Sequence, residues 1–194
     1  MVAKSVSARG FARERLLEAA LQLFAEHGVN GTSLQMIADR LGVTKASVYY
    51  QFQSKEDIVI AVIQPVFDDI LRLVRIAESM TSPEAQQEAV LGGLVEFAVR
   101  HRRLTAAFYG DPAIESVVHS HVEFEDATVR LSALLAGPDP TIAQRVTTSM
   151  IAAGVYGSAT DPRLRDVADA DLHRALLECV QRLHHSDARL GARD

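Results

Sequence analysis

Residues 32–55 contain several short polar side chains and two lysines, residue types that commonly contact DNA. A short helix is expected to begin at residue 44, and small or polar groups at such a helix end reach base edges and phosphates. The residues in this position are Thr44, Lys45, Ala46 and Ser47. Lys55 stands at the start of the next expected helix, where its charge and the free backbone N–H groups favour a phosphate. The chemistry predicted for this stretch is hydrogen bonding to a nucleic acid.

Two short helices around a glycine turn are expected to position these groups. Thr32 and Gln35 have the T-x-x-Q spacing of a capping box, which predicts a helix from residue 32 to residue 41. Gly42 can adopt the left-handed conformation that ends a helix. Thr44 then caps a second helix, whose inward residue is Val48. Helix, glycine turn and helix form a helix-turn-helix unit, and the second helix of such a unit enters the major groove of DNA.

Three side chains of this unit could each have more than one role. Gln35 can complete the capping box or reach a base, and the two roles do not exclude each other. Tyr49 and Tyr50 cannot both face inward from one short helix. We expect one tyrosine to pack on the preceding helix of residues 11–27, and the other to contact a phosphate or a thymine methyl group.

The pattern as a whole resembles a known family. A long amphipathic helix ending in E-H-G is followed by G-T-S-L-x-x-I-A-x-x-L-G-V-T-x-A-S-V-Y-Y-x-F-x-S-K-E-D. Over about residues 11–58 this resembles the N-terminal domain of the tetracycline-repressor (TetR) family of bacterial transcriptional regulators. Ala46 stands where that family frequently has glycine, and Gln51 where it frequently has histidine, so different bases could be read. The expected DNA-contacting residues are Thr32, Ser33, Gln35, Thr44, Lys45, Ala46, Ser47, Tyr49, Tyr50 and Lys55.

The resemblance implies an all-α fold of about nine helices in two functional parts. We expect a flexible basic arm at residues 1–10, a DNA-binding domain at 11–57, an effector-binding and dimerisation domain at 58–185, and a flexible tail at 186–194. A long helix from Ser54 to about Met80 joins the two domains and contains Pro65, which removes a backbone hydrogen bond and should bend the helix. The hypothesis is that Pro65 is a signalling hinge.

The family also implies a function for the C-terminal part. We expect a homodimer through about residues 140–157 and 170–185, which would place two recognition helices on a palindromic operator. A small-molecule pocket is expected from Phe67, Phe97, His101, Phe108, Tyr109, Phe124, Met150 and Tyr156, although each of these could equally be core packing. The aromatic residues favour an apolar or aromatic effector. The expected activity is repression that the effector relieves, and the residues do not distinguish a repressor from an activator.

Charge is distributed unevenly along the chain. Residues 1–55 contain seven Lys/Arg and four Asp/Glu, a net charge of +3, whereas the remaining 139 residues contain thirteen and twenty-one, a net charge of −8. A basic end on an acidic body is typical of a protein that presents one end to phosphate. No apolar run approaches the ~18 residues of a membrane span, and no signal peptide is recognisable, so a cytoplasmic protein without a membrane partner is expected. The single cysteine, Cys179, is expected to be buried in a helix.

A metal site and an enzymatic activity are the alternatives to DNA binding. His119, His121, Glu123, Glu125 and Asp126 form a local cluster, but the two histidines point to different faces of a helix, so we expect neither a metal nor a cofactor. A helical-bundle enzyme is the alternative from another functional class. The sequence lacks H-E-x-x-H, a phosphate-binding glycine loop and a nucleophile elbow, so we expect no enzymatic activity.

Overall fold

The computed structural model describes residues 3–108 and 111–190, and these residues form ten α-helices and one short 3₁₀ helix without a strand. The α-helices are α1 (Ala3–Gly31), α2 (Leu34–Leu41), α3 (Lys45–Gln51), α4 (Lys55–Glu78), α5 (Pro83–Arg100), α6 (Arg102–Phe108), α7 (Pro112–Ser120), α8 (Val122–Ala136), α9 (Ile142–Thr160) and α10 (Asp169–Leu190), and the 3₁₀ helix is Pro162–Leu164. The all-α prediction is confirmed. The chain has one helix more than expected because the backbone breaks at His121, which separates α7 from α8.

The helices group into two compact units. The first unit contains residues 1–65 and 107–121, and the second contains residues 66–106 and 122–194. The boundaries of these compact units do not coincide with those of the predicted functional domains, which stay a prediction. The first unit continues into α4 as far as Pro65 rather than ending at residue 57, and it recruits residues 107–121 from the part of the chain expected to form the effector domain.

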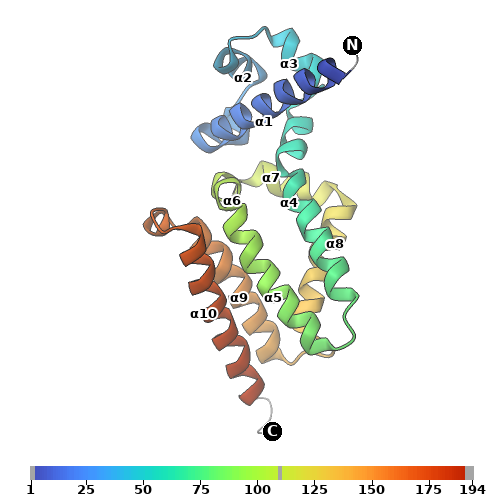
Figure 1. Cartoon of the computed structure of the whole chain (residues 1–194), viewed down its shortest axis with the longest axis vertical. Coiled ribbons are helices and arrows are strands. Elements are labelled where there is room, and N and C mark those ends of the chain that lie inside the picture. The colour runs from blue at the N-terminus through green and yellow to red at the C-terminus, as the bar shows by residue number, and fades with distance from the viewer. Residues whose placement is uncertain (1–2, 109–110, 191–194) are drawn as a thin grey trace. The chain divides into compact units, whose positions relative to one another are not determined.

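The first unit is built on α1, against which α2 packs, with α3 following across a short turn (Figure 1). The inner face of α1 buries Leu16, Ala20, Leu23 and Phe24. Helix α1 already begins at Ala3, so the helix continues through residues expected to form an arm, while Met1 and Val2 lie outside the described residues. The Arg40 guanidinium ties α2 to α1 through two hydrogen bonds to the Glu26 carboxylate, of 2.6 and 3.3 Å. These hydrogen bonds lower the pKa of Glu26.

A single carboxylate explains why residues 107–121 belong to the first unit. Gly28 breaks α1 with a φ of 71°, which a residue without a side chain adopts easily. The Val29 N–H freed by this break donates to Asp111 Oδ2 at 2.9 Å. The other oxygen, Asp111 Oδ1, caps α7 by accepting from Ala113 N–H at 2.9 Å. Phe108 then packs its ring 5.9 Å from that of Phe24, which completes the attachment of this segment to α1.

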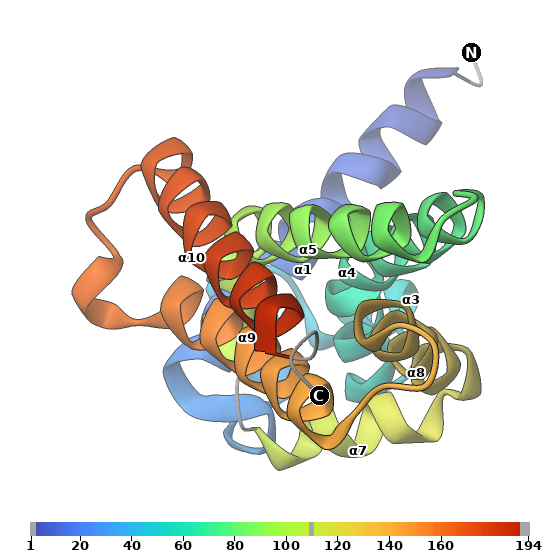
Figure 2. The same cartoon turned by 90° about the horizontal axis from the view of Figure 1, so that it is seen from below.

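Helix α5 is the centre of the second unit, where it packs against α8, α9 and α10 (Figures 1 and 2). Its buried side chains lie on more than one face, because several helices cover it: Val90, Leu91, Leu94, Val95, Phe97, Ala98 and Val99. The helix begins as predicted, with the Ser82 hydroxyl accepting from Ala85 N–H and Pro83 in the first turn. Helix α10 reaches Leu190, beyond the predicted end at residue 185, and Cys179 on it is exposed rather than buried.

The glycine pair in α5 allows a specific stability test. A methyl group added at Gly93 would lie 2.4 Å from a methyl carbon of Leu73 on α4, whereas one added at Gly92 would meet nothing within 4 Å. Gly92→Ala should therefore gain most of the helix-propensity difference and stabilise the protein by up to about 1 kcal/mol. In Gly93→Ala this gain is offset by the rearrangement of Leu73. Urea unfolding should find Gly93→Ala less stable than Gly92→Ala by about 1 kcal/mol. Equal stabilities would show that α4 and α5 do not approach closely here.

Candidate nucleic-acid interface and ligand cavity

Helix α2 is capped by Ser33 rather than by the predicted Thr32. The Ser33 hydroxyl accepts from Met36 N–H at 3.2 Å. Thr32 is only 2 % exposed, and its hydroxyl donates to the carbonyls of Leu23 (3.1 Å) and Gly28 (2.9 Å). Thr32 and Ser33 are adjacent, and both are residue types that commonly cap helices. Because Thr32 is buried, Ser33 caps α2. The predicted capping box is therefore wrong, and the Thr32 side chain holds the end of α1 instead of facing DNA.

The turn and the start of α3 follow the prediction. Gly42 adopts the left-handed conformation, with φ 65° and ψ 33°, and ends α2. Thr44 caps α3 by accepting from Ser47 N–H at 3.2 Å, and the two hydroxyls lie 2.9 Å apart. Val48 is fully buried and anchors α3 to the unit. The helix-turn-helix geometry is thus present, with caps at both helix starts.

Almost the whole surface of α3 is open. The exposed side chains in and around the unit are Ser33, Gln35, Thr44, Lys45, Ala46, Ser47, Tyr49 and Tyr50. Tyr49 is 47 % exposed and Tyr50 is 79 % exposed, so neither tyrosine is buried, and the packing of one of them on α1 stays a prediction. The Lys45 ammonium lies 5.7 Å from the centroid of the Tyr49 ring, so a cation and an aromatic ring share one exposed face of α3.

Gln35 pairs within its own helix instead of completing a capping box. Its side-chain amide donates to Asp39 Oδ1 at 2.7 Å, one turn along α2. The side chain remains exposed, so both the amide and the carboxylate lie on the surface next to the turn.

Arg13 of α1 contacts the end of α3, a role that the sequence pattern does not predict. Its guanidinium lies 4.9 Å above the ring of Phe52, the residue that ends α3.

Lys55 is directed into the first unit. Its ammonium donates to the carbonyls of Val29 (2.8 Å) and Thr32 (3.2 Å), at the end of α1. These carbonyls follow the break at Gly28, where helical hydrogen bonding stops. The half-buried ammonium donates to these carbonyls and so joins α4 to α1. The role expected for Lys55, a clamp on a phosphate, is not the contact that the structure gives it.

Replacing Lys55 with methionine should destabilise the first unit. Methionine keeps the apolar stem but removes two charge-assisted hydrogen bonds, so the free energy of unfolding should fall by about 2–3 kcal/mol. Lys45→Met is the matched control, because the Lys45 side chain is exposed and its contact is the Tyr49 ring; its effect should stay below about 1 kcal/mol. Denaturant unfolding followed by circular dichroism measures both. Equal effects would contradict a structural role for Lys55.

The second unit contains a cavity of about 520 Å³ between α8 and α9, with Ile70 of α4 and Leu94 of α5 also in its lining. Of the residues predicted to line an effector pocket, Tyr156 alone lies in this lining. Burial raises the pKa of Tyr156 to about 12, so its hydroxyl stays protonated at neutral pH. The volume lies within the usual range for small-molecule sites, about 300–1,000 Å³.

The other predicted pocket residues have different roles. Phe67 and Phe124 stack on each other, with ring centroids 3.4 Å apart. Phe97 is buried and meets Tyr156 edge-on, with centroids 6.3 Å apart. Met150 is 62 % exposed on α9, and Phe108 packs in the first unit. Tyr109 lies outside the described residues. Aromatic residue type alone did not separate core packing from a cavity wall.

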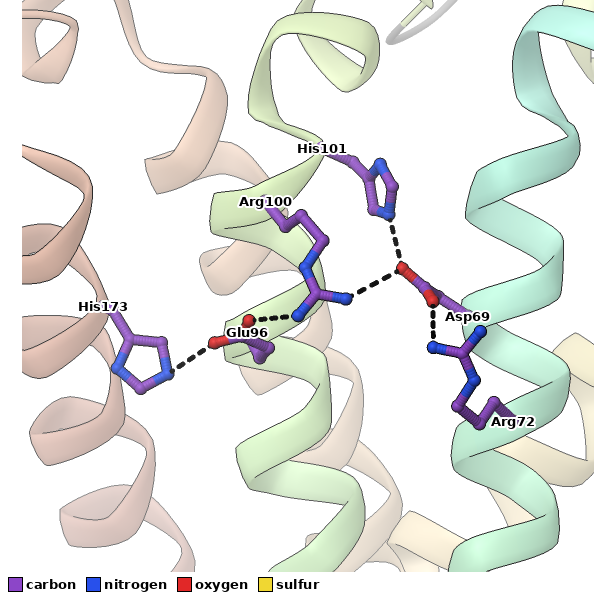
Figure 3. A network of polar contacts seen from close by, with 6 residues as sticks. All are labelled: Asp69, Arg72, Glu96, Arg100, His101 and His173. Carbon is purple, nitrogen blue, oxygen red and sulfur yellow. Dashed lines mark hydrogen bonds and ion pairs between the residues drawn. The ribbon is translucent and has the colours of Figure 1, made fainter.

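His101 belongs to a polar network rather than to the cavity wall (Figure 3). Its Nε2 lies 2.9 Å from Asp69 Oδ2, which also accepts from Arg100 Nη1 at 3.2 Å. The hydrogen bond with His101, and after it the hydrogen bond from Arg100, lowers the pKa of Asp69. Arg100 Nη2 also donates to Glu96 Oε1 at 2.6 Å, and Glu96 Oε2 lies 3.4 Å from His173 Nε2. The network joins α4, α5 and α10 across the surface of the second unit.

Two negative results concern the described residues only. None of the residues in ranges 3–108 and 111–190 forms a group of three or more metal-ligating side chains. His119 and His121 instead approach carbonyl oxygens of their own helix, those of Glu115 and Val117, at 2.7 and 3.0 Å. In the same ranges, no helix combines the length and the apolar character that crossing a membrane requires.

The sequence is similar to known regulators over its N-terminal part. Residues 16–62, from α1 into α4, match the family model described as "Bacterial regulatory proteins, tetR family". The HTH-type transcriptional repressor KstR2 of Mycolicibacterium smegmatis is 32 % identical over 102 residues, which cover 52 % of this chain and 49 % of that protein. The HTH-type transcriptional regulator RutR of Escherichia coli is 40 % identical over 65 residues, 34 % of this chain and 29 % of its own. The chain thus spans about half the length, or less, of these curated relatives.

Solved structures share the fold over most of the chain. The ketosteroid transcriptional regulator KstR2 of Mycobacterium tuberculosis has a TM-score of 0.67 at 21 % identity, and the match covers 89 % of this chain and 92 % of that one. FadR from Bacillus subtilis, solved in complex with stearoyl-CoA, has a TM-score of 0.59 at 15 % identity, with 86 % and 96 % covered. At these identities the likeness establishes a common fold.

Proposed function

We propose that this chain is a dimeric, ligand-responsive repressor of the TetR family of bacterial transcriptional regulators, and that it binds a palindromic operator. The observation that carries the proposal is the outward face of α3. A capped helix held by a single buried valine presents a lysine, short polar groups and two exposed tyrosines, which suit phosphates, base edges and thymine methyl groups. Bacterial DNA lies in the cytoplasm, where we place the protein.

A second copy of the chain is the proposed partner of α9. Ile142 (80 % exposed), Val146 and Met150 recur every four residues and form an apolar stripe on this helix. Further along, a Cβ added at Gly154 or Gly157 would meet nothing within 4 Å, so packing within the chain does not require these glycines. Apolar and small residues on one open face favour close contact with another helix. A two-fold pair of such chains would present two copies of α3.

The cavity between α8 and α9 is the proposed effector site. Its volume and mostly apolar lining suit a small molecule with an apolar part. FadR from Bacillus subtilis, which has the same fold, was solved in complex with stearoyl-CoA, and this supports a small-molecule ligand for the present chain. Effector binding would shift the protein toward a conformation with lower operator affinity. Repression rather than activation is proposed because the similar curated proteins from M. smegmatis and M. tuberculosis are repressors.

Footprinting on the region upstream of its own gene tests the proposal. The protein should protect a two-fold-symmetric sequence, and the logarithm of the binding constant should fall linearly with the logarithm of salt concentration. Equal binding to that region and to unrelated duplexes at all salt concentrations would contradict operator recognition. A repressor should also lower transcription from the protected promoter, whereas an activator would raise it.

A further inference from the structure

Arg145 gives the cavity of the second unit a single positive charge. It is the one charged residue in the described lining of this cavity. Arg100 and Arg130 of the same unit each form ion pairs with carboxylates. By contrast, the exposed Arg145 guanidinium makes no hydrogen bond or ion pair with any residue in the described ranges. Five N–H donors are therefore presented beside an apolar space without a protein acceptor.

One face of α9 combines this charge with the cavity wall. Arg145, Ser149, Ala152 and Tyr156 follow each other at helical spacing and all line the cavity. Ile70, Leu94, Leu131 and Leu135 supply apolar walls from α4, α5 and α8. The hydroxyl groups of Thr128, Ser132, Thr148 and Ser149 add further polar groups to the lining. The lining is thus amphipathic, with its charge in the first turns of α9.

We propose that the cavity binds an anionic amphiphile, with Arg145 pairing with the anionic head and the leucine-lined interior enclosing the apolar body. The inference rests on the proposed function, because it names the chemical class of the effector of that same site. A planar guanidinium matches a carboxylate or a phosphate through two parallel hydrogen bonds. A cationic head would be repelled by Arg145, and a neutral head would leave its charge unpaired.

Tyr156 is suited to the same ligand. It lines the cavity eleven residues after Arg145, and its hydroxyl makes no hydrogen bond with the described residues. A tyrosine that stays protonated at neutral pH adds no negative charge to the site, and its O–H can donate to an oxygen of the ligand. The described lining thus offers Arg145 and Tyr156 as donors, together with its hydroxyl groups, and no anionic group to a negatively charged head.

The test compares three probes that share one apolar chain: dodecanoate, 1-dodecanol and dodecylamine, each below its micellar concentration. Isothermal titration of the full chain should show that dodecanoate binds at least about 10-fold more tightly than the alcohol, and that the amine binds most weakly. Arg145→Gln should remove the preference for dodecanoate over the alcohol, and Arg145→Lys should retain part of it. Arg75→Gln is the matched control, since Arg75 is an exposed arginine of the second unit outside the cavity lining.

The outcomes separate this inference from the proposed function. Equal affinities for dodecanoate and dodecanol, an Arg145→Gln variant that binds like the parent, or no binding of any probe would overturn the anionic-head assignment. Operator binding without ligand, measured on the same preparation, tests the repressor function separately. If dodecanoate binds through Arg145 but does not release the operator, the result would support the anion site and contradict its role as the effector site.

Discussion

The double variant Lys45→Gln, Tyr50→Ala should bind the operator about 100-fold more weakly than the parent chain. Lys45 is exposed, so its charge is available to a phosphate, and Tyr50 projects from the same helix with 79 % of its surface exposed. Each contact is worth about 1–3 kcal/mol in a protein–DNA interface, and the two together account for the 100-fold loss. Fluorescence anisotropy with a labelled operator duplex measures it.

The single variants should lose affinity in different ways. Lys45→Gln should weaken binding to all duplexes and reduce the log–log salt slope by about 0.9, because it removes one phosphate contact. Tyr50→Ala should leave that slope unchanged if the ring contacts bases. Neither change should alter the free energy of unfolding by more than about 1 kcal/mol, since both side chains are exposed. Arg75→Gln, in the second unit, should bind DNA like the parent; a matching loss there would show a general charge effect.

Charging the apolar stripe of α9 should abolish high-affinity operator binding. In Val146→Glu, Met150→Glu, two carboxylates replace exposed apolar side chains on the proposed dimer face. A dimer binds both half-sites of the operator at once, which raises its overall affinity, whereas a monomer binds only one half-site. Operator affinity should therefore fall by about 1,000-fold. Sedimentation velocity should show a monomer at concentrations where the parent chain is a dimer.

Val129→Glu is the control for this charge. Val129 is an exposed apolar residue on α8 rather than on the proposed dimer face of α9, so its replacement should preserve both the dimer and operator affinity. A parent chain that sediments as a monomer, or a stripe variant that remains a tight dimer, would contradict the assignment of α9. Identical behaviour of the Val129 and α9 variants would mean that the effect comes from charge rather than from the interface.

Much of the first unit was predictable because its signals are local. Gly42 and Thr44 lie within a few residues of the helix ends that they determine, and their roles are confirmed. The differences from the predicted contacts involve hydrogen bonds to the end of another helix, α1, which local sequence signals do not show. Ser33 rather than Thr32 caps α2 because the Thr32 hydroxyl bonds to carbonyls of α1. Lys55 likewise donates to carbonyls more than twenty residues earlier.

The second unit was predictable in its helices but not in its cavity. Helical periodicity identifies apolar faces, yet it does not say which of them packs and which encloses space. Phe67 and Phe124, two residues predicted to line the pocket, instead stack on each other. Asp111 shows the same limit for domain boundaries, because its hydrogen bond to Val29 spans 82 residues. Arg145 could be recognised only once its lack of a partner among the described residues and its place at the cavity were known.

Selection from a random duplex library tests the central claim most directly, since it assumes no operator. The claim is that the protein reads DNA with two copies of α3. The parent chain should enrich a two-fold-symmetric sequence whose half-site centres are separated by about one helical turn or a multiple of it. The Lys45→Gln, Tyr50→Ala variant should enrich it weakly. Recovery of unrelated sequences with equal affinity by both proteins would contradict the account.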